Sequence, residues 1–290
     1  MTFVALATCQ NIPEPDVDEP LLVAALEARG VPAKVLAWDD DTVDWDAPKL
    51  TVIRSTWNYY RRPGPFLAWA LRRGERLVNA PALVRWNHHK RYLADLEASG
   101  LPIVPTLWLD RGSLARIEEL VAERGWSDIV VKPAVSAGSY RTSRLEGPPW
   151  DAQVFGDLVA AGDAMVQPYV KSVDGYGERS VVCIDGELTH AIRKSPRFVG
   201  DAEAVSAAVP IAEDERALAA AVLARAGGSP LYARVDIVRD EEGRAMLGEL
   251  ELIEPSLFLK QSPAALERLA AGIARRFQAG TSPGIADRIS

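Results

Sequence analysis

Apolar and polar positions alternate along the chain in a way that predicts a lobe of strands and helices at the N-terminus. Three short apolar runs predict strands at 3–8, 33–37 and 50–53. An amphipathic stretch from Leu21 to Gly30 and a second one over 66–71 predict helices. Strands that alternate with helices indicate a small parallel α/β lobe over about the first eighty residues.

The rest of the chain has the mixed pattern of an α+β protein. Helices are predicted near 87–99, 113–124, 213–226 and 263–277. Strands are predicted at 103–108, 129–131, 165–170, 180–184, 190–194, 231–238 and 245–253. The glycine- and proline-containing segment after 278 predicts a frayed tail. With 290 residues, the chain is long enough for two or three lobes with cores of their own.

Composition narrows the class of protein. Hydrophobic residues make up 48% and charged residues 25% of the chain, which is typical of a globular protein. The net charge is -7 and basic residues occur only in short groups, so a nucleic-acid partner is not expected. No apolar run approaches a membrane span, and no secretory signal opens the chain. The cysteines, Cys9 and Cys183, lie far apart in apolar runs, which favours a cytoplasmic protein.

Charged residues interrupt the apolar pattern of the last two predicted strands. They come in pairs two residues apart, Arg234 with Asp236 and Glu249 with Glu251. Residues two apart in a strand face the same way, and the polar segment 239–244 suits a hairpin turn. Such groups are costly to bury without a partner, and Mg²⁺ is a natural partner of clustered carboxylates. A hairpin edge crossed by ion pairs explains this segment equally well.

A second pattern joins a strand to a small, hydroxyl-rich loop. Lys132 stands at the end of the strand, and the loop that follows contains Ser136, Gly138 and Ser139. Such a loop can bring backbone N–H and hydroxyl groups close to phosphate oxygens, while the lysine adds a positive charge. The Gly-Lys-Ser/Thr of a Walker motif is absent, and Gly/Ser loops also occur as plain turns.

Two further segments place polar groups after predicted strands. Gln167 precedes Pro168, which cannot donate to a strand ladder and leaves backbone groups that a flat heterocycle could use. An edge strand is the simpler explanation of this proline. The segment from Arg54 to Tyr59 follows a strand end, where such sheets bind ligands, and it could grip a carboxylate. A contact with the next lobe explains its aromatic residues at least as well.

Taken in order, these segments resemble the ATP-grasp superfamily, most closely its D-alanine–D-alanine ligase and glutathione-synthetase type. The resemblance covers about 78–258 and rests on Lys90, Lys132-Pro133 with its loop, Gln167-Pro168-Tyr169-Val170, Arg234-x-Asp236 and Glu249-x-Glu251. It implies an α/β fold of three lobes, with ATP held between two α+β subdomains. The expected bounds are 1–85 for an N-terminal lobe, 86–164 for a central subdomain with a lid loop, and 165–290 for a C-terminal subdomain.

The resemblance also implies roles for the matching residues. Those expected to bind ATP are Lys90, Lys132, Ser136, Gly138, Ser139, Gln167, Tyr169, Val170, Glu178 and Lys194. The expected Mg²⁺ ligands are Asp236, Glu249 and Glu251, and Arg234 would stabilise charge during catalysis. From their place beyond strand ends, the residues expected to contact substrate are Arg54, Thr56, Trp57, Tyr59 and Ser256.

Two departures from the superfamily pattern concern the metal and the substrate. Glu251 occupies a position that is usually asparagine, which adds negative charge to the metal site. The segment Leu252-Ile253-Glu254-Pro255-Ser256 replaces the usual Asn-x-x-Pro-Gly loop, which helps to form the acyl-group site in the relatives. Substrate handling is therefore expected to differ from that of the common ligases.

A closer resemblance, carried by 53–59, 132–140 and 249–256, is to a small bacterial ATP-grasp branch with a D-cycloserine-forming member. It implies an ATP-dependent ligase that makes an acyl-phosphate of a small amino-acid-like substrate. The attacking nitrogen belongs either to the same molecule, as in closure of O-ureido-D-serine, or to a second amino acid. A non-catalytic ATP-binding scaffold is the third alternative. Homodimers are common in such relatives, so a dimer is expected.

Overall fold

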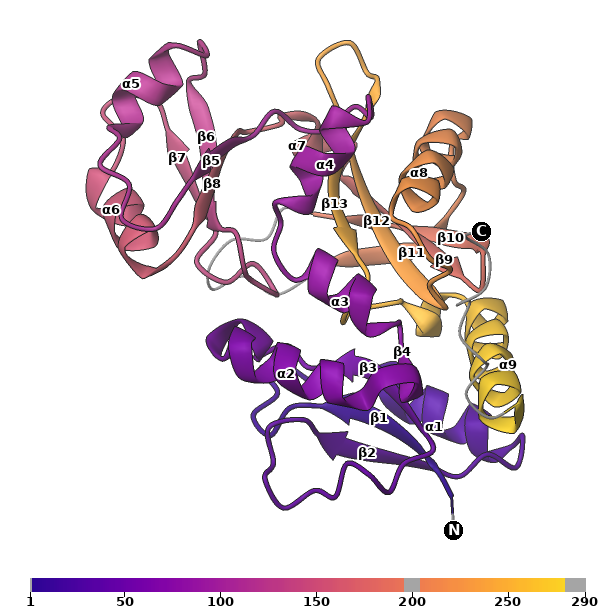
Figure 1. The fold of residues 1–290 in the computed structure, drawn as a ribbon. Helices are drawn as coiled ribbons and strands as arrows, with labels where there is room; N and C mark the ends of the chain where they lie inside the picture. Colours follow the sequence, from indigo (N-terminus) through magenta and orange to yellow (C-terminus); the bar gives the residue numbers. More distant parts are fainter. Residues whose placement is uncertain (1, 196–203, 280–290) are drawn as a thin grey trace, which may run out of the picture.

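The first of three sheets in the computed structural model is parallel and contains the N-terminal strands (Figure 1). The structure describes residues 2–195 and 204–279. The strands of this sheet are β1 (Val4–Thr8), β2 (Ala33–Ala37), β3 (Leu50–Ser55) and β4 (Leu77–Val78), paired in the order β2-β1-β3-β4. Helices α1 (Glu19–Glu27) and α2 (Pro63–Arg73) connect them. The alternating pattern therefore predicted this lobe correctly.

The second sheet is antiparallel and has a core of its own. Its strands are β5 (Leu107–Leu109), β6 (Asp128–Pro133), β7 (Ser143–Glu146) and β8 (Ala164–Pro168), in the order β5-β8-β6-β7. Two helices, α5 (Ile117–Ala122) and α6 (Ala152–Ala161), pack on it through Val121, Phe155 and Leu158. Neither β7 nor α6 was predicted from the sequence. β7 buries only Leu145 and has no run of apolar residues that would indicate a strand.

The third sheet is antiparallel and carries the charged strands. Its strands are β9 (Glu178–Ile184), β10 (Glu187–Lys194), β11 (Val205–Val209), β12 (Tyr232–Arg239) and β13 (Ala245–Glu251), in the order β11-β10-β9-β12-β13. Buried side chains of α3 (Pro81–Asn87), α4 (Tyr92–Ala98) and α8 (Glu213–Arg225) pack with this sheet in one cluster. A short helix, α7 (Ser172–Gly175), precedes β9.

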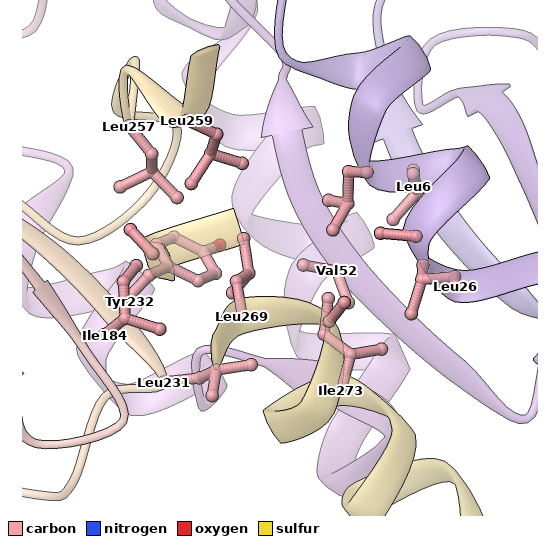
Figure 2. Packing of buried hydrophobic residues seen from close by; sticks show 14 of the residues in the cluster. Leu6, Leu26, Val52, Ile184, Leu231, Tyr232, Leu257, Leu259, Leu269 and Ile273 are labelled. Carbon is pink, nitrogen blue, oxygen red and sulfur yellow. The ribbon is translucent and has the colours of Figure 1, made fainter. Parts of the chain in front are cut away.

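A single apolar core joins the first sheet to the third. Figure 2 shows Leu6 and Val52 from the first sheet on one side of this cluster and Tyr232 on the other, with Leu269 between them on α9 (Pro263–Ala279). The Tyr232 hydroxyl lies 2.8 Å from the backbone oxygen of Ile53 and donates a hydrogen bond to it. Because these side chains are fully buried together, the first and third sheets form one continuous body.

Two predicted boundaries need correction, and a third prediction cannot be compared with the described residues. The helix expected over 87–99 begins only at Tyr92, because residues 88–91 form a turn, and the preceding helix α3 was not predicted. The lobe boundary expected between 164 and 165 falls inside β8, which pairs with β5 and β6 and so belongs to the second sheet. The tail predicted after 278 lies, from residue 280 on, outside the described residues.

Candidate functional site

A cavity of about 380 Å³ opens where residues of all three sheets and their loops meet. Most of the residues singled out from the sequence line it: Trp57, Tyr59, Lys90, Lys132, Ser136, Gly138, Ser139, Gln167, Tyr169, Val170, Glu178, Lys194, Arg234, Asp236, Glu249, Glu251 and Ser256. Such a concave site with converging polar groups is the usual form of a small-molecule site. The fold therefore gathers these distant segments around one space.

Strand pairing places the charged residues of β12 and β13 directly opposite one another. Arg234 pairs with Glu251 and Asp236 pairs with Glu249 in the antiparallel register. The Arg234 guanidinium donates to both carboxylate oxygens of Asp236 at 2.9 Å, and it also donates to Glu251. Two-residue spacing and this register put all four side chains on one face, as the sequence predicted.

A second set of ion pairs comes from the neighbouring strands β9 and β10. Lys194 pairs in register with Glu178, and its ammonium lies 2.5 Å from the Glu178 carboxylate and 3.1 Å from that of Asp236. Ser180, opposite Asp236 on β9, donates a hydrogen bond to it at 2.6 Å. Gly177 has φ +82°, and a Cβ there would lie 2.9 Å from the Lys194 backbone oxygen. The close approach of these strands requires glycine at this position.

Two lysines reach the carboxylates from outside the third sheet. Lys90 lies in the turn between α3 and α4 and forms an ion pair with Glu249. The backbone N–H of Lys90 donates to the Ala134 oxygen at 2.8 Å, which ties this turn to the loop after β6. Lys132 lies on β6, and burial lowers the pKa of its ammonium group. Four cationic side chains thus face the carboxylates of the cavity.

Burial acts differently on the individual carboxyl groups. It raises the pKa of Glu251 to about 7, since the neighbouring carboxylates oppose the effect of Arg234. Burial also favours the neutral form of Asp236, but Arg234 and Lys194 outweigh it and hold the Asp236 pKa below its usual range. The pKa of Glu249 is also lowered, because Lys90 and Lys132 outweigh the effect of burial. Cations therefore outweigh burial at Asp236 and Glu249, but not at Glu251.

The donor set fits Mg²⁺ by its chemistry. Carboxylates of Asp236, Glu249 and Glu251 are hard oxygen ligands on adjacent strands, and Mg²⁺ needs only one or two of them besides phosphate oxygens. Burial raises the pKa of Glu251 despite Arg234, and a bound cation would favour its ionised form. Among the described residues, however, no group of three or more His, Cys, Asp or Glu side chains is arranged as a metal site. The carboxylates of Asp236, Glu249 and Glu251 instead contact lysines and an arginine.

The opposite wall of the cavity is built mainly from β6, β8 and the loop between β6 and β7. Gln167 is buried and donates its side-chain amide to the Thr106 hydroxyl at 2.8 Å. The central carbon of the Arg144 guanidinium lies 3.7 Å from the centroid of the Tyr169 ring. In the loop, Gly138 and Ser139 have φ +58° and +60°, which turns the backbone sharply beside the cavity.

Aromatic side chains connect this loop to the first lobe. The ring of Tyr140 stacks on that of Tyr60, with ring centroids 4.2 Å apart. Tyr59, in the short 3₁₀ turn Tyr59–Arg61, donates its hydroxyl to the Ser136 backbone oxygen at 3.4 Å. The aromatic residues after β3 therefore make the contact between lobes that the sequence left open as an alternative. Trp57 and Tyr59 also line the cavity.

The structure does not bring Arg54 and Thr56 to the cavity. The strand predicted to end at residue 53 continues through Ser55, so Arg54 is 1% exposed and lies beneath the cavity wall. Its guanidinium donates to the Pro255 backbone oxygen at 3.1 Å. Thr56 is fully buried as well. The expectation that both contact substrate is therefore not met by this geometry.

Two carboxylates in the cavity were not assigned to the site from the sequence. Glu14, in the loop after β1, and Glu254, after β13, both line it. The signal for Glu254 was present, since it is an acidic residue within the buried run 252–255. The loop that contains Glu14 has several prolines and acids, and nothing in its pattern distinguishes this one.

The arrangement of three sheets around this cavity is that of an ATP-grasp ligase. A D-alanine–D-alanine ligase from Bacillus anthracis in complex with ATP superposes with a TM-score of 0.72, covering 96% of this chain and 97% of that one at 14% identity. The ATP-grasp ligase PsnB, in complex with a minimal precursor, Mg and ADP, superposes with 0.64, covering 95% and 97% at 18% identity. These neighbours share the fold and bind ATP or ADP, one of them with Mg.

Sequence similarity makes the assignment narrower. Residues 4–79 match the family model described as the N-terminal domain of D-cycloserine synthetase DcsG. The cycloserine biosynthesis protein DcsG of Streptomyces lavendulae is 37% identical over 96% of this chain and its own full length. A crystal structure of D-cycloserine synthetase DcsG has a TM-score of 0.86 at 36% identity, covering 95% and 99%. The chain belongs to the DcsG family of ATP-grasp ligases.

This membership confirms the predicted ATP-grasp fold, the ligase class and the resemblance to the D-cycloserine-forming branch. It also makes the non-catalytic scaffold an unsupported alternative. Within the part of the chain that the structure describes, no helix is long and apolar enough to cross a membrane.

Proposed function

We propose that this ligase uses ATP and Mg²⁺ to activate the carboxylate of a small amino-acid-like molecule and then closes a ring within that molecule. The substrate we propose is O-ureido-D-serine, and the product is D-cycloserine. The observation that carries the proposal is the wall of opposed charged pairs on β12 and β13, in a chain that matches DcsG over nearly its whole length.

ATP is held, in this proposal, between the second and third sheets. Lys90, Lys132 and Lys194 contact its phosphates, and the loop with Ser136, Gly138 and Ser139 covers them. Gln167 and the backbone of Tyr169 and Val170 hold the adenine, and Glu178 takes the ribose hydroxyls. The positions of all these side chains around one cavity support these roles.

The carboxylates of Asp236, Glu249 and Glu251 are the proposed Mg²⁺ ligands. When bound, Mg²⁺ neutralises charge on the β- and γ-phosphates, as it does in phosphoryl transfer generally. Glu251 faces the cavity on the strand next to Asp236, which supports its use as a ligand in place of asparagine. Arg234 holds Asp236 and Glu251 in position through its hydrogen bonds.

The proposed chemistry has two bond-forming steps. A carboxylate oxygen of the substrate bonds to the γ-phosphorus, the bond from that phosphorus to the bridging oxygen breaks, and ADP leaves. The ureido nitrogen next to oxygen then bonds to the acyl carbon and loses its proton, and phosphate leaves. In a final hydrolysis, water adds to the carbamoyl carbon, the bond from that carbon to the ring nitrogen breaks, and the nitrogen takes up a proton. The carbamic acid released gives CO₂ and ammonia, and the free ring remains. Arg234 faces the cavity and stabilises the negative charge that develops at the acyl group.

Release of ADP, measured with single amino acids and with pairs, tests this function. O-ureido-D-serine alone should support turnover and yield a product with the mass of D-cycloserine. A strict requirement for two amino acids would contradict ring closure and indicate an intermolecular ligase. Nucleotide binding without turnover of O-ureido-D-serine or any other amino acid in a panel of D- and L-forms would overturn the proposal.

We further propose that the enzyme works as a homodimer in the cytoplasm. Sedimentation velocity checks the dimer, and a monomer at micromolar concentration would contradict it. Free Cys9 and Cys183, both buried, support a reducing compartment, since neither takes part in a disulfide. Cell fractionation followed by ADP-release assays checks the compartment.

A further inference from the structure

Glu254 is a buried carboxylate for which the described residues of the cavity supply no ion pair. Glu254 is 7% exposed and lines the cavity together with Glu251 and Arg234. Among the described residues, none donates a hydrogen bond to its carboxylate or forms an ion pair with it. An ionised carboxylate buried without a partner is strongly unfavourable, so such a group favours its protonated form in the ligand-free protein. A cationic group of a ligand bound in the cavity would favour the ionised form.

Three of the four cationic side chains that face the cavity are already paired with carboxylates other than Glu254. The fourth, Lys132, forms no ion pair with Glu254 among the described residues. Lys90 contacts Glu249, Lys194 contacts Glu178 and Asp236, and Arg234 contacts Asp236 and Glu251. None of these three cationic side chains forms an ion pair with Glu254 in the part of the chain that is described. Mg²⁺ and the phosphates of ATP bring charges that largely offset each other, and they therefore do not supply the cation that Glu254 lacks.

The turn that carries Glu254 is held in place by hydrogen bonds to its backbone. The Trp57 indole donates to the oxygen of Glu254 itself at 3.0 Å, and Arg54 donates to that of Pro255 at 3.1 Å. Arg234 donates to the oxygen of Ser256 at 3.4 Å. Two of these donors come from the first lobe, so the tertiary fold fixes where the Glu254 carboxylate lies. Pre-positioned groups of this kind are suited to ligand recognition.

From this geometry we infer that Glu254 binds the ammonium group of the amino-acid substrate, an assignment that rests on the proposed function. In an α-amino acid, the ammonium and carboxyl groups sit on the same carbon atom. A substrate whose carboxyl group lies at Arg234 therefore places its ammonium group within reach of the neighbouring turn. An ammonium group supplies both the missing positive charge and hydrogen-bond donors.

This assignment makes Glu254 a specificity residue rather than a metal ligand. It explains why arginine and tryptophan of the first lobe are directed at the backbone of the turn while the carboxylate stays unpaired. Glu14 is the rival carboxylate, because it also lines the cavity and comes from the opposite lobe. The test must therefore separate Glu254 from Glu14.

The experiment compares an amino acid with its des-amino counterpart in the wild type and in Glu254→Gln. The probes are O-ureido-D-serine and 3-(ureidooxy)propanoic acid, or the most active amino acid of the panel and its des-amino form. We expect wild-type kcat/KM for ADP release to fall about 10- to 100-fold without the amino group, the range for a lost charge-assisted hydrogen bond. In Glu254→Gln, kcat/KM for ADP release should differ by less than about threefold between the two probes, and KM for ATP should be unchanged.

Glu14→Gln is the matched control and should keep the wild-type preference for the amino form. Loss of preference in Glu14→Gln with retention in Glu254→Gln would overturn the assignment, as would equal use of both probes by the wild type. A change in Mg²⁺ dependence without a change in preference would identify Glu254 as a metal ligand instead and also overturn it. Glu254→Asp, expected to keep part of the preference, covers the case in which the Gln variant fails to fold. No ADP release with any amino acid would instead overturn the proposed function, and this assignment with it.

Discussion

The two walls of the cavity are built in different ways. On the third sheet, the wall is a set of side chains that the strand register locks into ion pairs, with Arg234 between Asp236 and Glu251. On the second sheet, the wall is a lysine, an amide and a loop whose backbone turns through left-handed conformations. The first wall shares a core with the N-terminal lobe, whereas the second has a separate core.

This difference suggests where substitutions matter most. Removing one charge from a network of buried ion pairs leaves its partners uncompensated, so effects on the third-sheet wall should be large. The loop wall offers backbone N–H groups that any side chain leaves in place, so effects there should be smaller. Four substitutions, from the largest expected effect to the smallest, test this contrast.

Asp236→Asn should have the largest effect. The change removes a proposed metal ligand and leaves Arg234 and Lys194 without their shared carboxylate. We expect kcat for ADP release to fall by about 10²- to 10³-fold, the range for losing one group that stabilises transition-state charge. Asp214→Asn, which removes an ion pair between an exposed aspartate and Arg239, is the control. Its kcat should stay within about twofold of the wild-type value. Near-normal kcat in Asp236→Asn would contradict the metal role.

Lys132→Met on the opposite wall should have a smaller but clear effect. This lysine faces the cavity from β6, and loss of a charge-assisted contact to phosphate corresponds to about 10- to 100-fold in kcat/KM for ATP. Lys171→Met, an exposed lysine shortly after β8, serves as the control. If Lys132→Met were as damaging as Asp236→Asn, the two walls would contribute equally and the contrast would fail.

Glu254→Gln should stabilise the ligand-free protein at neutral and alkaline pH. Burial and the nearby Glu251 raise the pKa of Glu254 well above its usual value. Below the unfolded-state pKa of about 4.3 the group is protonated in both states, and the wild type loses nothing. As pH rises, the unfolded state releases its proton first, so wild-type stability falls relative to the variant.

Melting temperatures of both proteins between pH 4 and 8 measure this difference. Each unit of pKa elevation corresponds to about 1.4 kcal/mol, and each kcal/mol to about 2–4 °C in Tm. The gap should be near zero at pH 4 and should widen with pH. Glu97→Gln, an exposed site on α4, should follow the wild type at every pH. A constant gap would show that charge is not its cause.

Tyr140→Ala should have the smallest effect of the four. It removes the stacking contact between the loop and Tyr60, and an aromatic pair contributes about 0.5–1.5 kcal/mol. We expect KM for ATP to rise about 2- to 10-fold with kcat little changed. Tyr140→Phe keeps the ring and should behave as the wild type. A fall in kcat/KM for ATP of more than about 100-fold would show that the loop wall depends on side chains as strongly as the charged wall does.

The sequence predicted the regular parts of the fold better than its boundaries. Strands β1, β3 and β12 come from runs of buried residues, and the hairpin turn predicted within 239–244 was correct. The second lobe was harder, because β7 buries a single apolar residue and α6 follows a proline-rich segment. Short elements of this kind are fixed by packing against neighbours, which local patterns do not contain.

The candidate site was predictable where residues lie close together in sequence. Two-residue spacing placed Arg234 with Asp236 and Glu249 with Glu251, and the order of motifs gave the superfamily. Arg54 was misplaced because β3 runs two residues further than its apolar run, which takes this side chain beneath the wall. Glu254 was noticed as a departure, but its lack of a partner appears only when the other charges are placed.

By itself, the sequence determined the class of protein, because its motifs in their order resemble those of the ATP-grasp superfamily. Only the tertiary structure decided which of these groups meet and which stay unpaired. Burial and pairing depend on residues far apart in the chain, such as Lys90 with Glu249 and Trp57 with the turn at Glu254. The free energy of a buried charge depends on those partners, and no local pattern specifies them.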